Sequence, residues 1–151
     1  MALWDQLKER AQDMSSQAKT QVGKFKNKDF ANASMAMCAL IAAADGSISA
    51  EERRKTAGFI SNNDALSIFP ANELLERFNY YSGKLETDYD FGKVEAIQAL
   101  SKLKSKPDAA RAVIQVGIII GGSDGDFDKD EMQAVRESCN AVGIAPAEFD
   151  L

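Results

Sequence analysis

"FANASMAMCALIAAADGSISAEE", residues 30–52, joins an apolar segment to an Asp-Gly turn and then to the start of a charged segment. Apolar and small residues fill residues 30–44 almost completely, which is typical of a buried central helix. Asp45 and Gly46 predict a turn, because Asp bonds nearby backbone N–H groups and Gly accepts a positive φ. We therefore expect a helical hairpin whose first arm is buried and whose second arm is amphipathic.

The chain contains this unit twice. A shift of 79 residues superimposes the copies, and the matched pairs are Ile41 with Ile120, Asp45 with Asp124, Gly46 with Gly125 and Glu52 with Glu131. The second copy also has its own apolar segment, residues 108–121. Such a duplication favours two helical hairpins packed about a pseudo-twofold axis, with both acidic turns at one end of the bundle.

The segments between the copies are also helical in pattern, and alternating β-branched runs are missing. In residues 90–105 the helical steps run through Phe91, Val94, Ile97, Leu100 and Leu103. Gly143 is a plausible helix end, and "PAEF", residues 146–149, a last helical turn. We predict an all-α fold class of about seven helices, with duplicated helical hairpins in a bundle and an N-terminal amphipathic helix.

That N-terminal helix is expected at residues 1–22. Its apolar or small positions recur at steps of three and four, at Leu3, Leu7, Ala11, Met14, Ala18 and Val22. The stripe is predicted to pack on the body of the chain or on a partner; with Trp4 it could instead lie on an anionic membrane surface.

A lysine-rich linker is expected at about residues 23–29. Residues 1–28 carry six basic and three acidic side chains, a net charge of +3, whereas the rest of the chain carries twelve and twenty, a net charge of −8. We therefore divide the chain into an amphipathic helix with its basic linker, 1–28, and a helical domain, 29–151.

Composition excludes several function classes. The chain has no histidine, so Ser-His-Asp and Cys-His catalysis are excluded, and zinc and copper are disfavoured as well. Cys38 and Cys139 are expected in the core as inert small hydrophobes. The net charge of −5 disfavours nucleic acid as a partner. The sequence shows neither a secretory signal nor an apolar run of the ~18 residues that span a bilayer, so we expect a cytoplasmic protein.

The acidic turns resemble half of a calcium-binding EF-hand loop. With Asp124 at loop position 5, Gly125, Phe127 and Glu131 fall where the loop needs them, but positions 1 and 3 lack side-chain oxygens. A standard EF-hand is therefore rejected. A site that combines carboxylates of both turns stays open, and its hard oxygens would take calcium, magnesium or manganese. The candidate ligands are Asp45, Glu51, Glu52, Asp124, Asp126, Asp128, Asp130 and Glu131.

Two alternatives need no metal. Ser49 with Glu52, and Asp128 with Glu131, have the spacing of helix capping boxes, so the turns could be purely structural. That interpretation leaves Glu51, Asp126 and Asp130 unexplained, and crowded like charges repel one another unless a cation relieves them. The acidic turns could also form a surface that binds another protein.

The paired "DGSISAEE" and "DGDFDKDE" turns, each after an apolar helix, resemble those of the tellurite-resistance protein TerB family. The resemblance extends from "VGKFKNKDF" to the "APAEFDL" ending. It implies an all-α fold, a cytoplasmic role in tellurite resistance and related stress, and an integral membrane partner of the TerC type. It also implies metal binding through Asp45, Glu52, Asp124 and Glu131.

We therefore expect a non-enzymatic stress-response protein without an organic cofactor. It would bind a divalent cation or a TerC-like partner through its acidic turns, in the cytoplasm at the inner face of the cell membrane, with peripheral membrane association left open. The alternative is a metal-dependent enzyme that uses paired carboxylates.

Overall fold

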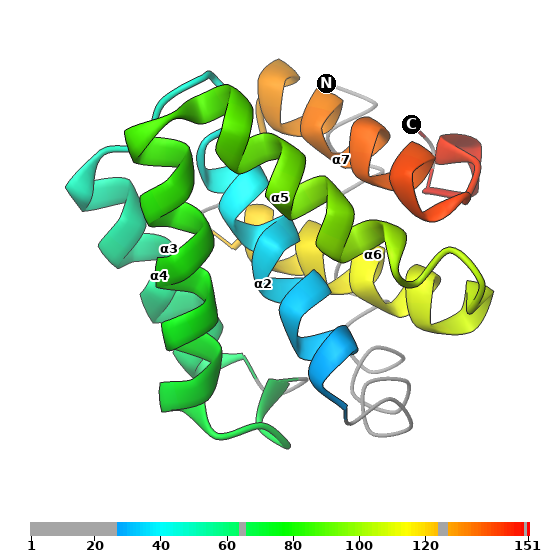
Figure 1. The fold of residues 1–151 in the computed structure, drawn as a ribbon, viewed down its shortest axis with the longest axis horizontal. Helices are drawn as coiled ribbons and strands as arrows, with labels where there is room; N and C mark the ends of the chain where they lie inside the picture. The colour runs from blue at the N-terminus through cyan, green and yellow to red at the C-terminus, as the bar shows by residue number, and fades with distance from the viewer. Residues whose placement is uncertain (1–26, 64–65, 124–126, 150) are drawn as a thin grey trace.

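The computed structural model describes residues 27–63, 66–123, 127–149 and 151. Within these ranges the chain is all helical and contains no strand, which confirms the predicted fold class (Figure 1). The elements are α2 (Lys28–Ala42), α3 (Ala50–Asn62), α4 (Ala71–Thr87), α5 (Tyr89–Ser101), α6 (Pro107–Gly121), α7 (Lys129–Val142) and the short 3-10 helix η2 (Pro146–Phe149). The helix predicted at residues 1–22 lies outside the described residues.

The first helix of the described part begins slightly earlier than the sequence predicts. The side chain of Asn27 caps α2 by accepting a hydrogen bond from the backbone N–H of Phe30, at 2.9 Å. Lys28 and Asp29 therefore belong to the helix and not to the linker predicted at about residues 23–29. An asparagine at this position satisfies a backbone N–H that would otherwise lack an acceptor.

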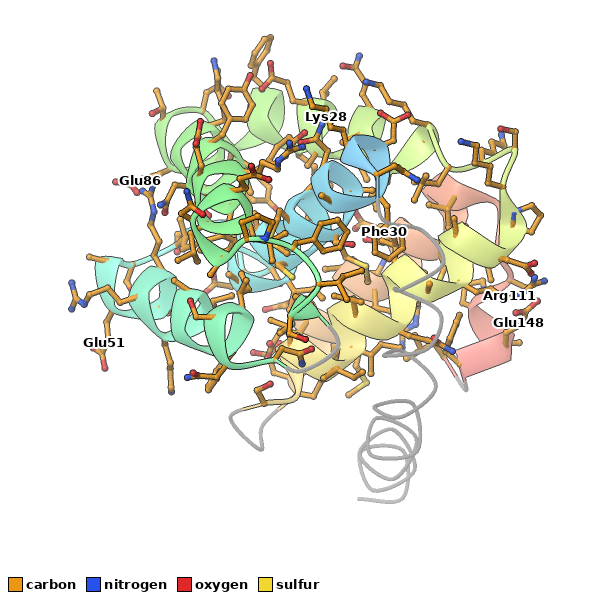
Figure 2. The ribbon with its side chains drawn as sticks, turned by 90° about the horizontal axis from the view of Figure 1, so that it is seen from below. Lys28, Phe30, Glu51, Glu86, Arg111 and Glu148 are labelled. Carbon is orange, nitrogen blue, oxygen red and sulfur yellow. The ribbon has the colours of Figure 1, made fainter. Side chains whose placement is uncertain are left out.

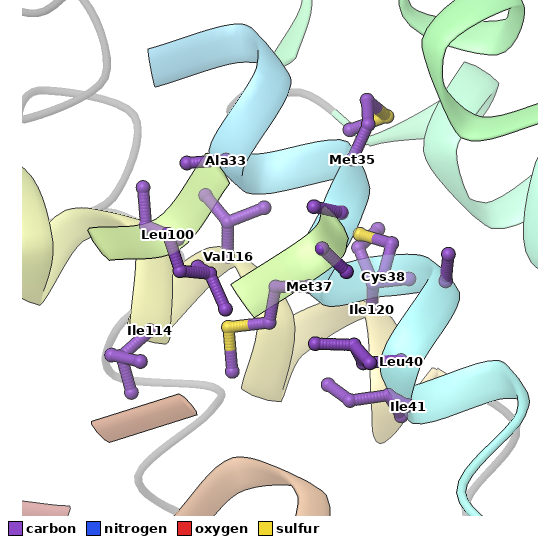
Figure 3. Packing of buried hydrophobic residues seen from close by; sticks show 14 of the residues in the cluster. Ala33, Met35, Met37, Cys38, Leu40, Ile41, Leu100, Ile114, Val116 and Ile120 are labelled. Atoms are coloured by element: carbon purple, nitrogen blue, oxygen red, sulfur yellow. The ribbon is translucent and has the colours of Figure 1, made fainter. Parts of the chain in front are cut away.

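Helix α2 lies at the centre of the bundle and packs against α4, α5, α6 and α7 (Figure 1). Most side chains of α2 and α6 are buried, as their apolar composition predicted. Figure 3 shows Met37 of α2 on the side of Leu100 and Val116, which come from α5 and α6, with Leu40 and Ile41 further along α2. The two apolar arms of the duplicated hairpins thus pack against each other and form the core of the protein.

Each copy of the repeat folds as a helical hairpin, α2–α3 in the first and α6–α7 in the second. Gly143 ends α7 in the left-handed conformation, with φ of 79°. The chain then closes with η2, which an ion pair ties to α6: Arg111 Nε lies 2.9 Å from Glu148 Oε2 (Figure 2). None of the helices in the described ranges combines the length and the hydropathy that a membrane span requires.

Helix α5 does not turn its largest apolar residues toward the core, as their helical spacing would suggest. Phe91 and Val94 are 56% and 54% exposed, whereas Gly92, Ala96 and Ala99 are buried. A Cβ on Gly92 would lie 2.6 Å from the backbone nitrogen of Leu85, so the backbones of α4 and α5 are in close contact there. Close packing requires small residues at the crossing, and this turns the larger side chains outward. Leu100 and Leu103, further along the segment, are buried.

Candidate cation site between the two acidic turns

The two acidic turns meet at one pocket of about 180 Å³. Asp45 and Glu52 of the first copy line it, and so do Asp128 and Glu131 of the second. Its apolar part is formed by Cys38, Ile41, Phe59 and Ile120, which come from α2, α3 and α6. The duplication therefore brings carboxylates that are far apart in sequence to the same end of the bundle, as the repeat predicted.

The first turn is held by local hydrogen bonds. Gly46 has a φ of 97°, which a residue with a side chain rarely adopts. Asp45 Oδ1 accepts hydrogen bonds from the backbone N–H of Ser47 at 3.1 Å and from its hydroxyl at 3.3 Å. Ile48 is buried below the turn. The backbone of the turn is therefore fixed by its own residues, which positions the Asp45 carboxylate at the pocket.

Both helices that leave the turns begin with a capping box, as predicted. In α3 the Ser49 hydroxyl accepts from the Glu52 N–H at 3.0 Å, and Glu52 Oε1 accepts from the Ser49 N–H at 3.1 Å. In α7 Asp128 Oδ1 accepts from the Glu131 N–H at 2.8 Å, and Glu131 Oε1 accepts from the Asp128 N–H at 3.0 Å. Each glutamate therefore reaches the pocket while its Oε1 atom serves a cap.

The remaining predicted ligands do not gather at this pocket. Glu51 is exposed and projects outward from α3 (Figure 2). Asp130 lines a different pocket of about 50 Å³, which also contains Lys93 and Glu137. Asp124 and Asp126 lie outside the described residues. Among the residues that are described, no three Asp, Glu or Cys side chains lie close enough together to hold a metal ion.

Hard carboxylate oxygens fit calcium, magnesium or manganese in type, but the described donors do not form a complete coordination shell. Asp45 and Asp128 already accept hydrogen bonds from their own turn or cap. A cation at this pocket would thus need further oxygens from water or from other parts of the second turn. The described carboxylates alone do not form a closed protein cage for a metal ion.

Sequence reasoning missed Lys55 and Thr56, which also line the pocket. They follow Glu52 by three and four residues, so they share its face of α3, and helical spacing could have identified them. The ammonium group of Lys55 supplies a positive charge beside the carboxylates. Because an internal cation lowers their mutual repulsion, Lys55 is expected to compete with a bound metal ion.

The thiols do not add a nucleophile to the pocket. Burial raises the pKa of Cys38, which lies in the pocket wall, to about 12, and burial raises the pKa of Cys139 to about 12 as well. Both are therefore protonated thiols at neutral pH, consistent with the predicted core role. The pocket is also smaller than the ~300–1,000 Å³ common for small-molecule sites, and the chain has no histidine to act as a base.

Comparison with known proteins points to one family. The family model described as "Tellurite resistance protein TerB" matches residues 31–151. The chain is also similar to the "Tellurium resistance protein TerB" of an Alcaligenes species, with 34% identity over 118 residues, which cover 78% of this chain and 97% of that protein. No solved structure was found to match the chain.

Proposed function

The chain belongs to the TerB family of tellurite-resistance proteins, and from this premise we propose that it supports resistance without catalysing a reaction, by holding a hard divalent cation between its two acidic turns. The cation would be calcium, magnesium or manganese, because the available donors are carboxylate oxygens. The observation that carries the proposal is the shared pocket, where Asp45 and Glu52 of one copy approach Asp128 and Glu131 of the other.

The geometry supports a modest affinity. Glu52 and Glu131 each direct one carboxylate oxygen to a backbone N–H of the cap, and Lys55 adds a positive charge. A divalent ion must compete with both. In this proposal Asp124 and Asp126 of the second turn complete the shell, whereas Glu51 and Asp130 contribute only to the acidic surroundings.

The capping boxes offer a way to test the ion without disturbing the fold. Glutamine at the third helical position can replace glutamate in a capping box, because its side-chain oxygen also accepts the backbone hydrogen bond. It carries no charge, however, so it is a weaker ligand for a hard divalent cation than the carboxylate that it replaces. Glu52→Gln combined with Glu131→Gln should therefore preserve both caps and weaken cation binding.

We expect millimolar calcium, magnesium or manganese to raise the Tm of the chelator-treated wild-type protein. The stabilisation follows RT ln(1 + [L]/Kd), about 2.7 kcal/mol at a hundredfold excess over Kd. In E52Q/E131Q most of this gain should disappear, whereas Lys55→Gln should raise the affinity. Thermal denaturation with each cation, and calorimetric titration of the same proteins, measure both effects.

Glu51→Gln is the matched control, because it removes the same charge from the same helix at a side chain that points away from the pocket. It should keep the cation-specific gain. Monovalent salt at equal ionic strength controls for screening. If that salt stabilises the wild type as well as the divalent ions do, the turns are structural and the proposed site is wrong.

The same acidic pocket supports a second candidate, a partner protein that inserts a lysine or arginine side chain. The rim carries carboxylates while Ile41, Phe59 and Ile120 line its apolar part, which suits a long aliphatic side chain with a cationic end. The TerC-like integral membrane protein is the partner that we propose, at the inner face of the membrane. Partner binding that E52Q/E131Q abolishes while divalent ions leave Tm unchanged would favour this candidate.

The metal-dependent enzyme stays the less supported alternative. It needs a carboxylate pair that activates a metal-bound substrate within an enclosed pocket. The size of the pocket and the protonated thiols give it no support.

A further inference from the structure

An apolar patch covers the outer faces of α4 and α5. The large hydrophobic side chains that the described residues expose are Tyr80, Phe91 and Val94, at 51%, 56% and 54%. We call these three residues the α4–α5 patch. They come from two neighbouring helices and none of them lines the acidic pocket, so they form a surface distinct from the proposed cation site.

Polar contacts hold the patch together. The Lys84 ammonium lies 5.6 Å from the centre of the Tyr80 ring and 6.0 Å from that of Phe91. The Tyr80 hydroxyl donates to Glu95 Oε2 at 3.1 Å. Lys84 thus links the two rings, and Glu95 fixes the outer end of Tyr80, so the aromatic groups form one surface rather than isolated side chains.

The core does not need this surface. Helix α5 packs on α4 through Gly92, and Ala96 and Ala99 are its other small residues that face the core. Phe91 and Val94 therefore contribute little to the packing of the body. Single exposed hydrophobic residues are ordinary, whereas adjacent ones on two helices form a contiguous apolar surface of the kind that commonly serves as an interaction site.

The N-terminal segment has the complementary property. Residues 3–22 carry an apolar stripe at helical steps, and an amphipathic helix of this kind gains most of its stability by packing its apolar face on another surface. The sequence therefore gives this segment an apolar stripe to cover, and the described part of the chain exposes the apolar α4–α5 patch.

The chain enters the folded body beside α4. Arg77 Nη1 donates to the backbone oxygen of Lys28 at 3.3 Å and to Asn32 Oδ1 at 2.6 Å. Arg77 precedes Tyr80 of the patch by three residues, one helical turn. The four residues 23–26 can span about 13 Å when extended, and a twenty-residue helix is about 30 Å long, so the stripe reaches the patch.

Charge also favours this pairing. Residues 1–28 carry a net charge of +3. Lys84 places one positive charge within the patch and Arg77 another one turn away, whereas Glu76 and Glu86 on α4, Asp90 on α5 and Glu95, which accepts from Tyr80, give the surrounding surface more acidic than basic side chains. A basic segment on this face is attracted, whereas a second copy of the acidic body would be repelled.

We propose that the apolar stripe of residues 3–22 docks on the α4–α5 patch of the same chain. The N-terminal segment thereby covers Phe91 and Val94, and the lysines that follow it lie against the acidic side chains at the edge of the patch. This inference does not depend on the cation site.

Trp4 is the only tryptophan in the chain, so its fluorescence reports on the N-terminal segment alone. In the full-length wild type we expect a blue-shifted emission and protection from acrylamide quenching. Phe91→Ser with Val94→Ser should shift the emission to the red and remove the protection. Asn140→Ser, an exposed change on α7, is the control and should leave both unchanged.

A second pair of variants tests the stripe itself. Leu7→Ser with Met14→Ser should expose Trp4 like the patch variant, whereas Lys8→Ser, off the stripe, should not. Circular dichroism verifies that the body stays folded, which the exposure of Phe91 and Val94 leads us to expect.

Three results would overturn the proposal. Equal emission and quenching in the wild type and the patch variant would show that the patch is not the docking surface. Protection that appears only as protein concentration rises would identify a second copy as the occupant. Protection that requires vesicles of phosphatidylserine and phosphatidylcholine would identify a membrane surface instead.

Discussion

Gly92→Ala is expected to destabilise the protein by about 3 kcal/mol, although alanine is the better helix former by about 1 kcal/mol. The added Cβ would lie 2.6 Å from the backbone nitrogen of Leu85 and 2.7 Å from the carbonyl carbon of Lys84. Both contacts are with backbone atoms, which cannot rotate away as the end of a side chain can. Helices α4 and α5 must therefore separate, and the packing between them is lost.

Gly58→Ala is the matched control, because Gly58 lies inside α3 with nothing within 4 Å of its added Cβ. It should stabilise the protein by roughly 0.5–1 kcal/mol through helix propensity. Urea denaturation of both variants measures the difference. A Gly92→Ala protein as stable as wild type would mean that α4 and α5 do not cross as closely as described here.

Phe127→Ala should lower the free energy of unfolding by about 3 kcal/mol. This value is near the lower end of the range for replacing a buried phenylalanine with alanine, because the site lies at the edge of the core. Phe127 is 3% exposed and packs at the end of α6, where a Cβ on Gly121 would lie 3.0 Å from both Phe127 Cε2 and Ile41 Cγ2. This ring anchors the second acidic turn to the core. Its removal should therefore also weaken the cation-specific gain in Tm.

Phe127→Leu keeps most of the side-chain volume, so it should lower the free energy of unfolding by only about 1 kcal/mol. Thermal and urea denaturation, with and without divalent cation, compare the two variants. If alanine and leucine cost the same, the loss does not come from the cavity, and Phe127 does not anchor the turn by packing.

Local signals made most of the helices predictable. The positions of α2 and α6 follow from long apolar runs with a turn at one end, although α2 begins two residues before its run, and the capping boxes follow from residues three positions apart. These interactions join near neighbours in the chain, so a short window of sequence contains both partners. The buried Ile48 and Phe127 beneath the turns were predictable for the same reason.

The candidate site was only partly predictable. The 79-residue repeat indicated that the two acidic turns belong together, and Asp45, Glu52, Asp128 and Glu131 do line one pocket. The exclusion of Glu51 and Asp130 from that pocket depends on the direction of each side chain around its helix axis. Lys55 lines the pocket because it lies on the same face of α3 as Glu52. The pattern of charges in the sequence did not by itself reveal this.

The sequence by itself determined the all-helical class, the two hairpins, their caps and the burial of α2 and α6, because these depend on backbone hydrogen bonds and on apolar runs too long to stay in water. Only the tertiary structure decided which face of α5 turns inward. Gly92, Ala96 and Ala99 are buried because small residues let two helix backbones approach, and this geometric advantage outweighs the greater hydrophobicity of Phe91 and Val94. Hydropathy measures how strongly a side chain avoids water and not how closely its backbone can pack, so that choice is made only when the helices meet.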